Sequence, residues 1–66
     1  MDDEVIMEKE LDELRQQHKQ IDATIREVEE MPFPDQLKLM RLKREKLRVK
    51  DAIYQLEEVM YPDIIA

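Results

Sequence analysis

The chain of 66 residues contains no cysteine, no glycine and no tryptophan, and it has a single histidine. Without cysteine the fold cannot rest on disulfides, and this absence fits a reducing compartment. One histidine without cysteine cannot build the usual nitrogen and sulfur ligand set of a structural zinc site. No glycine-rich phosphate-binding loop can form either. We therefore expect no metal site, no cofactor and no catalytic residues.

Long apolar runs are also missing. No stretch approaches the ~18 apolar residues of a membrane span, and the N-terminal segment MDDEVIMEKE is acidic, unlike a signal peptide. We expect a cytoplasmic protein without a membrane segment. Charged residues make up 42% of the chain, which fits long helices that face solvent, with disorder as the alternative.

Proline marks the main break in the chain. The segment MPFPD, residues 31–35, holds two of the three prolines, and proline ends a helix because it lacks the N–H and clashes with the preceding turn. Asp35 suits the first turn of a following helix, and Pro62 ends that helix near Tyr61. The predicted single domain therefore has a helix at about 3–30, a turn at 31–35, a helix at about 36–61 and an apolar tail at 62–66.

Both predicted helices carry apolar residues in alternating steps of three and four, the heptad spacing of a coiled-coil seam. This regular spacing argues against disorder. An antiparallel hairpin fills every layer of the seam when paired residue numbers sum to 67, which centres the turn between Phe33 and Pro34. The predicted seam consists of Met7, Leu11, Leu14, His18, Ile21, Ile25 and Val28, facing Met60, Leu56, Ile53, Val49, Lys46, Leu42 and Leu39, respectively. Flanking charges fit the same register, with Asp22 near Lys43 or Lys50, Glu29 near Lys43, and Arg15 near Glu57.

The segments LDELRQQHKQID, LMRLKREKLRVKDAIYQLE and PDIIA together resemble the YdcH-like family of small bacterial proteins. These are helical hairpins with no established biochemical function, and they are similar to SlyX-type hairpins. Nearly the whole chain takes part, and PDIIA is similar to the alphaproteobacterial form. Arg44 stands where the family commonly has lysine. The resemblance implies a bacterial cytoplasmic hairpin that self-associates, and it supplies no catalytic residue. Its recurring features match His18, Asp22, Leu42, Lys43, Lys46, Leu47, Lys50 and Asp51.

The second predicted helix has more apolar surface than one partner helix can bury, because its apolar residues cover about 220° of its circumference. A chain below ~70–80 residues has a small core and usually needs disulfides, a metal or oligomerisation. We therefore predict an all-α antiparallel coiled-coil hairpin that forms a homo-oligomer, most simply a four-helix dimer. The predicted oligomer interface consists of Met40, Leu47, Ala52, Tyr54, Val59 and Tyr61.

Charge is distributed unevenly along the predicted hairpin. Residues 1–13 and 51–66, which form its open end, carry a net charge of −10, whereas residues 14–50 at the turn end carry +4. Two hairpins that lie antiparallel place acidic ends beside basic ends, and a parallel pair stacks like charges. Electrostatics therefore favours an antiparallel dimer, weakened by salt.

The basic run KLMRLKREKLRVK allows a second interpretation, since Arg41, Arg44 and Arg48 lie on the outward face and could contact an anionic partner. Nucleic acid is disfavoured because the chain has a net charge of −6 and no aromatic residue lies between the arginines. An acidic protein partner for the same arginines is an alternative. We predict a non-enzymatic adaptor or accessory subunit, with a nucleic-acid-associated modulator or a stabilising subunit of a large complex as alternatives.

His18 and the C-terminal tail are the two remaining features. A neutral His18 at pH 7, bonded across the seam or to water, is expected because Lys46 lies one layer away. As a polar seam residue it can help to fix register and oligomeric state. Ile64 and Ile65 either pack near Met7 or on a second protomer, or form a C-terminal peptide that another protein binds.

Overall fold

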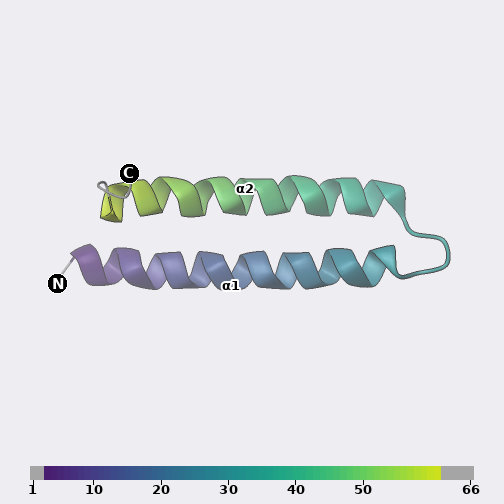
Figure 1. The fold of residues 1–66 in the computed structure, drawn as a ribbon, viewed down its shortest axis with the longest axis horizontal. Helices are drawn as coiled ribbons and strands as arrows, with labels where there is room; N and C mark the ends of the chain where they lie inside the picture. Colours follow the sequence, from purple (N-terminus) through teal and green to yellow (C-terminus); the bar gives the residue numbers. More distant parts are fainter. Residues whose placement is uncertain (1–2, 62–66) are drawn as a thin grey trace.

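The computed structural model describes residues 3–61, which form two helices packed side by side (Figure 1). The first helix, α1, spans Asp3–Glu29, and the second, α2, spans Gln36–Met60. The chain reverses direction between them, so the start of α1 and the end of α2 lie at the same end of the molecule. The described residues contain no strand. The predicted all-α helical hairpin is confirmed.

Each helix ends one residue before its predicted boundary. After α1, the N–H of Glu30 donates to the carbonyl oxygen of Arg26 at 3.0 Å, and the N–H of Met31 donates to that of Val28 at 3.2 Å. This tightening of the last turn is common where a helix stops, and Pro32 follows directly. Tyr61 leaves the helical region, with φ −132° and ψ 67°, because the following proline disfavours helical backbone.

Asp35 caps α2 from outside the helix. Its backbone is extended, and its Oδ1 accepts a hydrogen bond from the N–H of Lys38 at 3.1 Å. Asp35 therefore lies directly before α2, in the segment 31–35 that was predicted as the turn, and acts as the N-cap of the helix. The side chain satisfies one of the N–H groups that lack a partner at the start of a helix. Its negative charge also interacts favourably with the positive end of the helix dipole.

The core is a single layer between the helices. Its buried residues are Leu11, Ile25, Val28, Leu39 and Val49. Ile25, Val28 and Leu39 form one cluster near the turn, against which Ile21 and Leu42 pack. The other predicted seam residues are half-buried: Met7, Leu14, His18, Lys46, Ile53, Leu56 and Met60. Packing is therefore tightest at the turn end of the hairpin.

Candidate interaction surface

The side of α2 that faces away from the seam carries a file of exposed apolar residues. Met40, Leu47, Tyr54 and Tyr61 recur every seven residues, with exposed fractions of 56%, 59%, 63% and 45%. Since a helix rises 1.5 Å per residue, Met40, Leu47 and Tyr54 extend for about 21 Å along α2, and Tyr61 follows directly after its end. We call these four residues the outer file. Exposed apolar side chains that recur on one face of a helix are typical of an interaction site.

The opposite flank of α2 is less exposed. Val59 is exposed, but Ala52 is half-buried. Both line a shallow open groove of about 320 Å³ between the helices, together with Glu10, Leu14, Gln55 and Leu56. The six predicted interface residues therefore divide between two flanks of α2. The four residues of the outer file lie on one flank, and Ala52 and Val59 lie on the other. The groove is open and mostly apolar, which suits a partner's side chain better than an enclosed ligand.

Ion pairs join the helices along one edge of the seam. Arg15 contacts Glu57 at 2.9 Å, and Lys43 lies 3.7 Å from Glu29. Both pairs were predicted from the register and are confirmed. Exposed pairs of this kind contribute only ~0–1 kcal/mol each, so they specify the register more than they stabilise it.

The third predicted pair was wrong. Asp22 contacts Lys46, at 2.7 Å, rather than Lys43 or Lys50. Lys46 occupies a seam position, and its side chain is long enough for the methylene groups to remain in the seam while the ammonium group reaches the edge. Arg26, one turn along α1, also approaches Asp22 at 3.6 Å.

The hydrogen bond from Lys46 holds the pKa of the Asp22 carboxyl group below its ordinary value of 3.8. Partial burial opposes this shift, and the positive charges of Lys46, Arg26 and His18 reinforce it. Asp22 is therefore a point where several cationic side chains meet. A lysine and an aspartate that appear unrelated in the heptad pattern form the closest ion pair of the seam.

His18 is half-buried in the seam, one turn before Asp22. Within residues 3–61 its ring has no hydrogen-bond partner, so the bond across the seam, one of the two expected arrangements, is not formed. The residue is also not among those that line the groove. Its position is that of a polar side chain in a mostly apolar layer.

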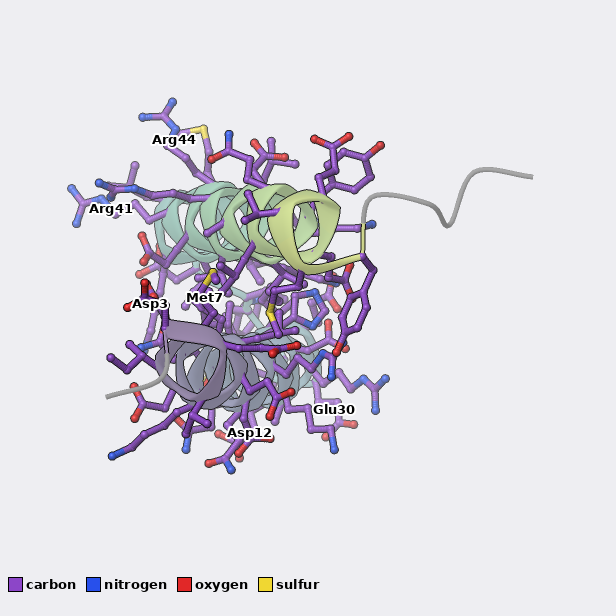
Figure 2. The ribbon with its side chains drawn as sticks, turned by 90° about the vertical axis from the view of Figure 1, so that its left-hand side faces the viewer. Asp3, Met7, Asp12, Glu30, Arg41 and Arg44 are labelled. Carbon is purple, nitrogen blue, oxygen red and sulfur yellow. The ribbon has the colours of Figure 1, made fainter. Side chains whose placement is uncertain are left out.

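The three arginines considered for anionic partners lie on successive turns of α2. Figure 2 shows Arg44 pointing away from α1, whereas Arg41 points to the side. Arg48 lies 3.8 Å from Glu45 on the same helix. The charge of Arg48 is thus partly compensated, and Arg41 and Arg44 point in different directions.

Sequence reasoning did not identify several exposed apolar residues: Val5, Ile6, Met31, Phe33 and Leu37. Phe33, at the tip of the turn, is 93% exposed. Its position between Pro32 and Pro34 was the available signal, because a residue before proline is kept out of the helical region and a tight turn lies outside the seam. The predictions for Ile64 and Ile65 lie outside the described residues.

No helix within residues 3–61 is long and apolar enough to cross a membrane. The same part of the chain contains no cluster of three or more histidine, aspartate or glutamate side chains that could hold a metal ion.

Residues 11–57 match the family described as "Protein of unknown function (DUF465)". The chain belongs to this family. The matched segment of this DUF465 hairpin runs from the buried Leu11 of α1 through the turn to Glu57 of α2, and so includes most of the seam. No curated protein and no solved structure matches the chain. The family description names no activity, so a function has to be argued from the surface of the hairpin.

Proposed function

We propose that this hairpin is a non-enzymatic protein that self-associates and acts as an adaptor or accessory subunit through contacts with other proteins. The observation that carries the proposal is the exposed outer file of α2. A coiled-coil helix needs only its seam to be apolar. The outer file therefore adds apolar surface for which the hairpin alone has no use.

The size of the surface supports the same proposal. The chain exposes 5833 Å², whereas a compact monomer of the same mass exposes about 4,500 Å². Only five of the described residues are buried, and none of them is completely buried. A core of this size stabilises a small domain weakly, and burial of the outer file in an assembly adds the missing apolar contacts.

The use of polar residues in the seam supports a role other than catalysis. The polar side chains with the closest contacts, Asp22 with Lys46 and Arg15 with Glu57, form ion pairs that join the two helices. The polar groups of the groove, Glu10 and Gln55, come from an otherwise apolar lining. The resemblance to the YdcH-like hairpins supports a bacterial cytoplasmic setting for this role.

The proposal is tested by removing apolar surface from the outer file. A Leu47→Ser, Tyr54→Ser double variant should fold as a hairpin but lose self-association in sedimentation equilibrium, because both residues are exposed in the isolated hairpin. The matched control is a Val5→Ser, Phe33→Ser double variant, which removes exposed apolar residues elsewhere and should associate like the wild type. Equal association of all three proteins would overturn the proposal.

A nucleic-acid-associated role is the second candidate. It is favoured by Arg41 and Arg44, which are exposed and have no ion-pair partner within the described residues. The net charge of −6 opposes it. A shift of DNA or RNA at physiological salt, with steep loss of binding as salt rises, would support this candidate over the adaptor.

A further inference from the structure

The outer file of α2 has charged residues on both sides. One neighbouring file consists of Lys43, Lys50 and Glu57, and the other consists of Arg44, Asp51 and Glu58. Both run from basic residues near the turn to acidic residues near the open end. The apolar residues and both sets of charges share the seven-residue spacing, so all three files are parallel along α2, with Tyr61 directly after the end of the helix.

We propose that a second copy of this chain docks on this surface, with the two α2 helices antiparallel and related by a two-fold axis. In the proposed register, paired apolar residue numbers sum to 101. Met40 therefore packs on Tyr61 of the second copy, and Leu47 packs on Tyr54. The inference rests on the proposed self-association and specifies its geometry. It differs from an association through the groove, which lies on the opposite flank of α2.

Charge complementarity favours this orientation. A two-fold axis between antiparallel helices brings each flanking file beside the same file of the second copy. Arg44 then meets Glu58 of the second copy, and Lys43 meets Glu57, with each pair formed twice. Like charges meet only where the two-fold axis passes between the helices, where Lys50 lies beside Lys50 of the second copy and Asp51 beside Asp51. A parallel arrangement would bring each file beside the other file of the second copy, so that Lys43 meets Arg44 and Glu57 meets Glu58, and only Lys50 meets an opposite charge, on Asp51.

The same charges disfavour a shift of the register by one heptad. A shift toward the turn keeps opposite charges together in one file, Arg44 with Asp51, but places Lys43 beside Lys50 in the other. A shift toward the open end likewise pairs Lys50 with Glu57 but places Asp51 beside Glu58, so either shift has fewer attractive pairs than the proposed register. Either shift also leaves one residue of the outer file without a partner, whereas the proposed register covers all four. Apolar burial and charge therefore select the same arrangement.

Arg44 and Glu58 give this proposal its sharpest test. Both are exposed, and neither has an ion-pair partner within residues 3–61. They are 14 residues apart on α2, which separates them by about 21 Å along the helix. They cannot contact each other within one chain. Any coupling between them in self-association must therefore act between two copies.

The experiment compares Arg44→Glu, Glu58→Arg and the double variant that carries both changes, by sedimentation equilibrium at low salt. Each single change replaces attraction by repulsion at two sites of the dimer, and we expect a rise of about tenfold in the dimer Kd. The double variant has the wild-type net charge, and the positive and negative charges at positions 44 and 58 are exchanged. It should return the Kd to within about threefold of the wild-type value, because most of the coupling is restored.

Arg41→Glu is the matched control, because it makes the same change of charge on the same helix at a side chain that points elsewhere (Figure 2). Far-UV circular dichroism shows whether each variant is helical. Two results would overturn the proposed register but not self-association itself. One is a wild type that dimerises together with a double variant whose dimer Kd does not return toward the wild-type value. The other is an equal rise of the dimer Kd in Arg41→Glu and Arg44→Glu. A folded wild type that remains a monomer at every concentration would overturn the proposed self-association as well.

Discussion

At the scale of single residues, His18 occupies a position where most coiled-coil seams have an apolar side chain. It is half-buried, and it lies in the layer predicted to contain the buried Val49. Such polar residues lower stability and can restrict a helix to one register or one oligomeric state.

The His18→Leu variant should therefore be more stable than the wild type, by about 1 kcal/mol, because leucine adds apolar burial to the seam. Its assembly should become looser or change in number, since the polar position no longer discriminates between arrangements. Denaturant unfolding and sedimentation equilibrium measure the two effects. Loss of stability together with an unchanged oligomer would show that His18 has no such role.

Asp22 links pH to the stability of the hairpin. Since Lys46 and its cationic neighbours lower the pKa of Asp22 in the folded state, folding favours the ionised carboxylate. The stabilisation is complete above the ordinary value of 3.8 and is lost as the pH falls through the lower pKa of the folded state.

We expect the wild type to lose stability on acidification in this range, and Asp22→Asn to lose less, because asparagine cannot ionise. Denaturant unfolding at a series of pH values provides the measurement. An identical dependence on pH in both proteins below pH 3.8 would contradict the assigned role of the Asp22–Lys46 pair.

The pairing of Asp22 also shows what heptad spacing can and cannot predict. Spacing gives the angle of each side chain about its helix, which was sufficient for Arg15 with Glu57 and Glu29 with Lys43. It does not give the reach of a side chain along or across the seam. Lys46 could thus be assigned to the seam from sequence, but its contact with Asp22 could not.

At the scale of the helices, the turn and the two seams were predictable because prolines and heptads are strong local signals. The ends of the helices were less predictable. Glu30 and Tyr61 lie just outside α1 and α2, and the conformation of such residues depends on hydrogen bonds that the sequence pattern does not specify. The exposure of Phe33 likewise depends on how the turn packs.

Asp35 provides a test at this scale. Its carboxylate accepts the N–H of Lys38 at the start of α2, and the tightest part of the core, around Leu39, follows directly. We expect Asp35→Ala to lower the free energy of unfolding by about 1 kcal/mol. Asp35→Asn should retain most of the stability, because its side-chain oxygen can still cap the helix. Equal stability of Asp35→Ala and the wild type would contradict the capping role.

At the scale of the whole molecule, the hairpin has an acidic open end and a basic turn end. An antiparallel assembly brings these ends together, so added salt should weaken it. We expect the dimer Kd to rise with sodium chloride concentration in sedimentation equilibrium. A Kd that falls with salt would indicate that apolar burial alone holds the assembly together and that charge opposes it.

Sedimentation equilibrium of the wild-type protein over a wide concentration range tests most directly whether the exposed outer file of α2 serves self-association. We predict a mass above the 8.0 kDa of one chain, rising with concentration toward a dimer or a higher oligomer. A helical, folded protein that keeps the mass of a single chain at every concentration would contradict it.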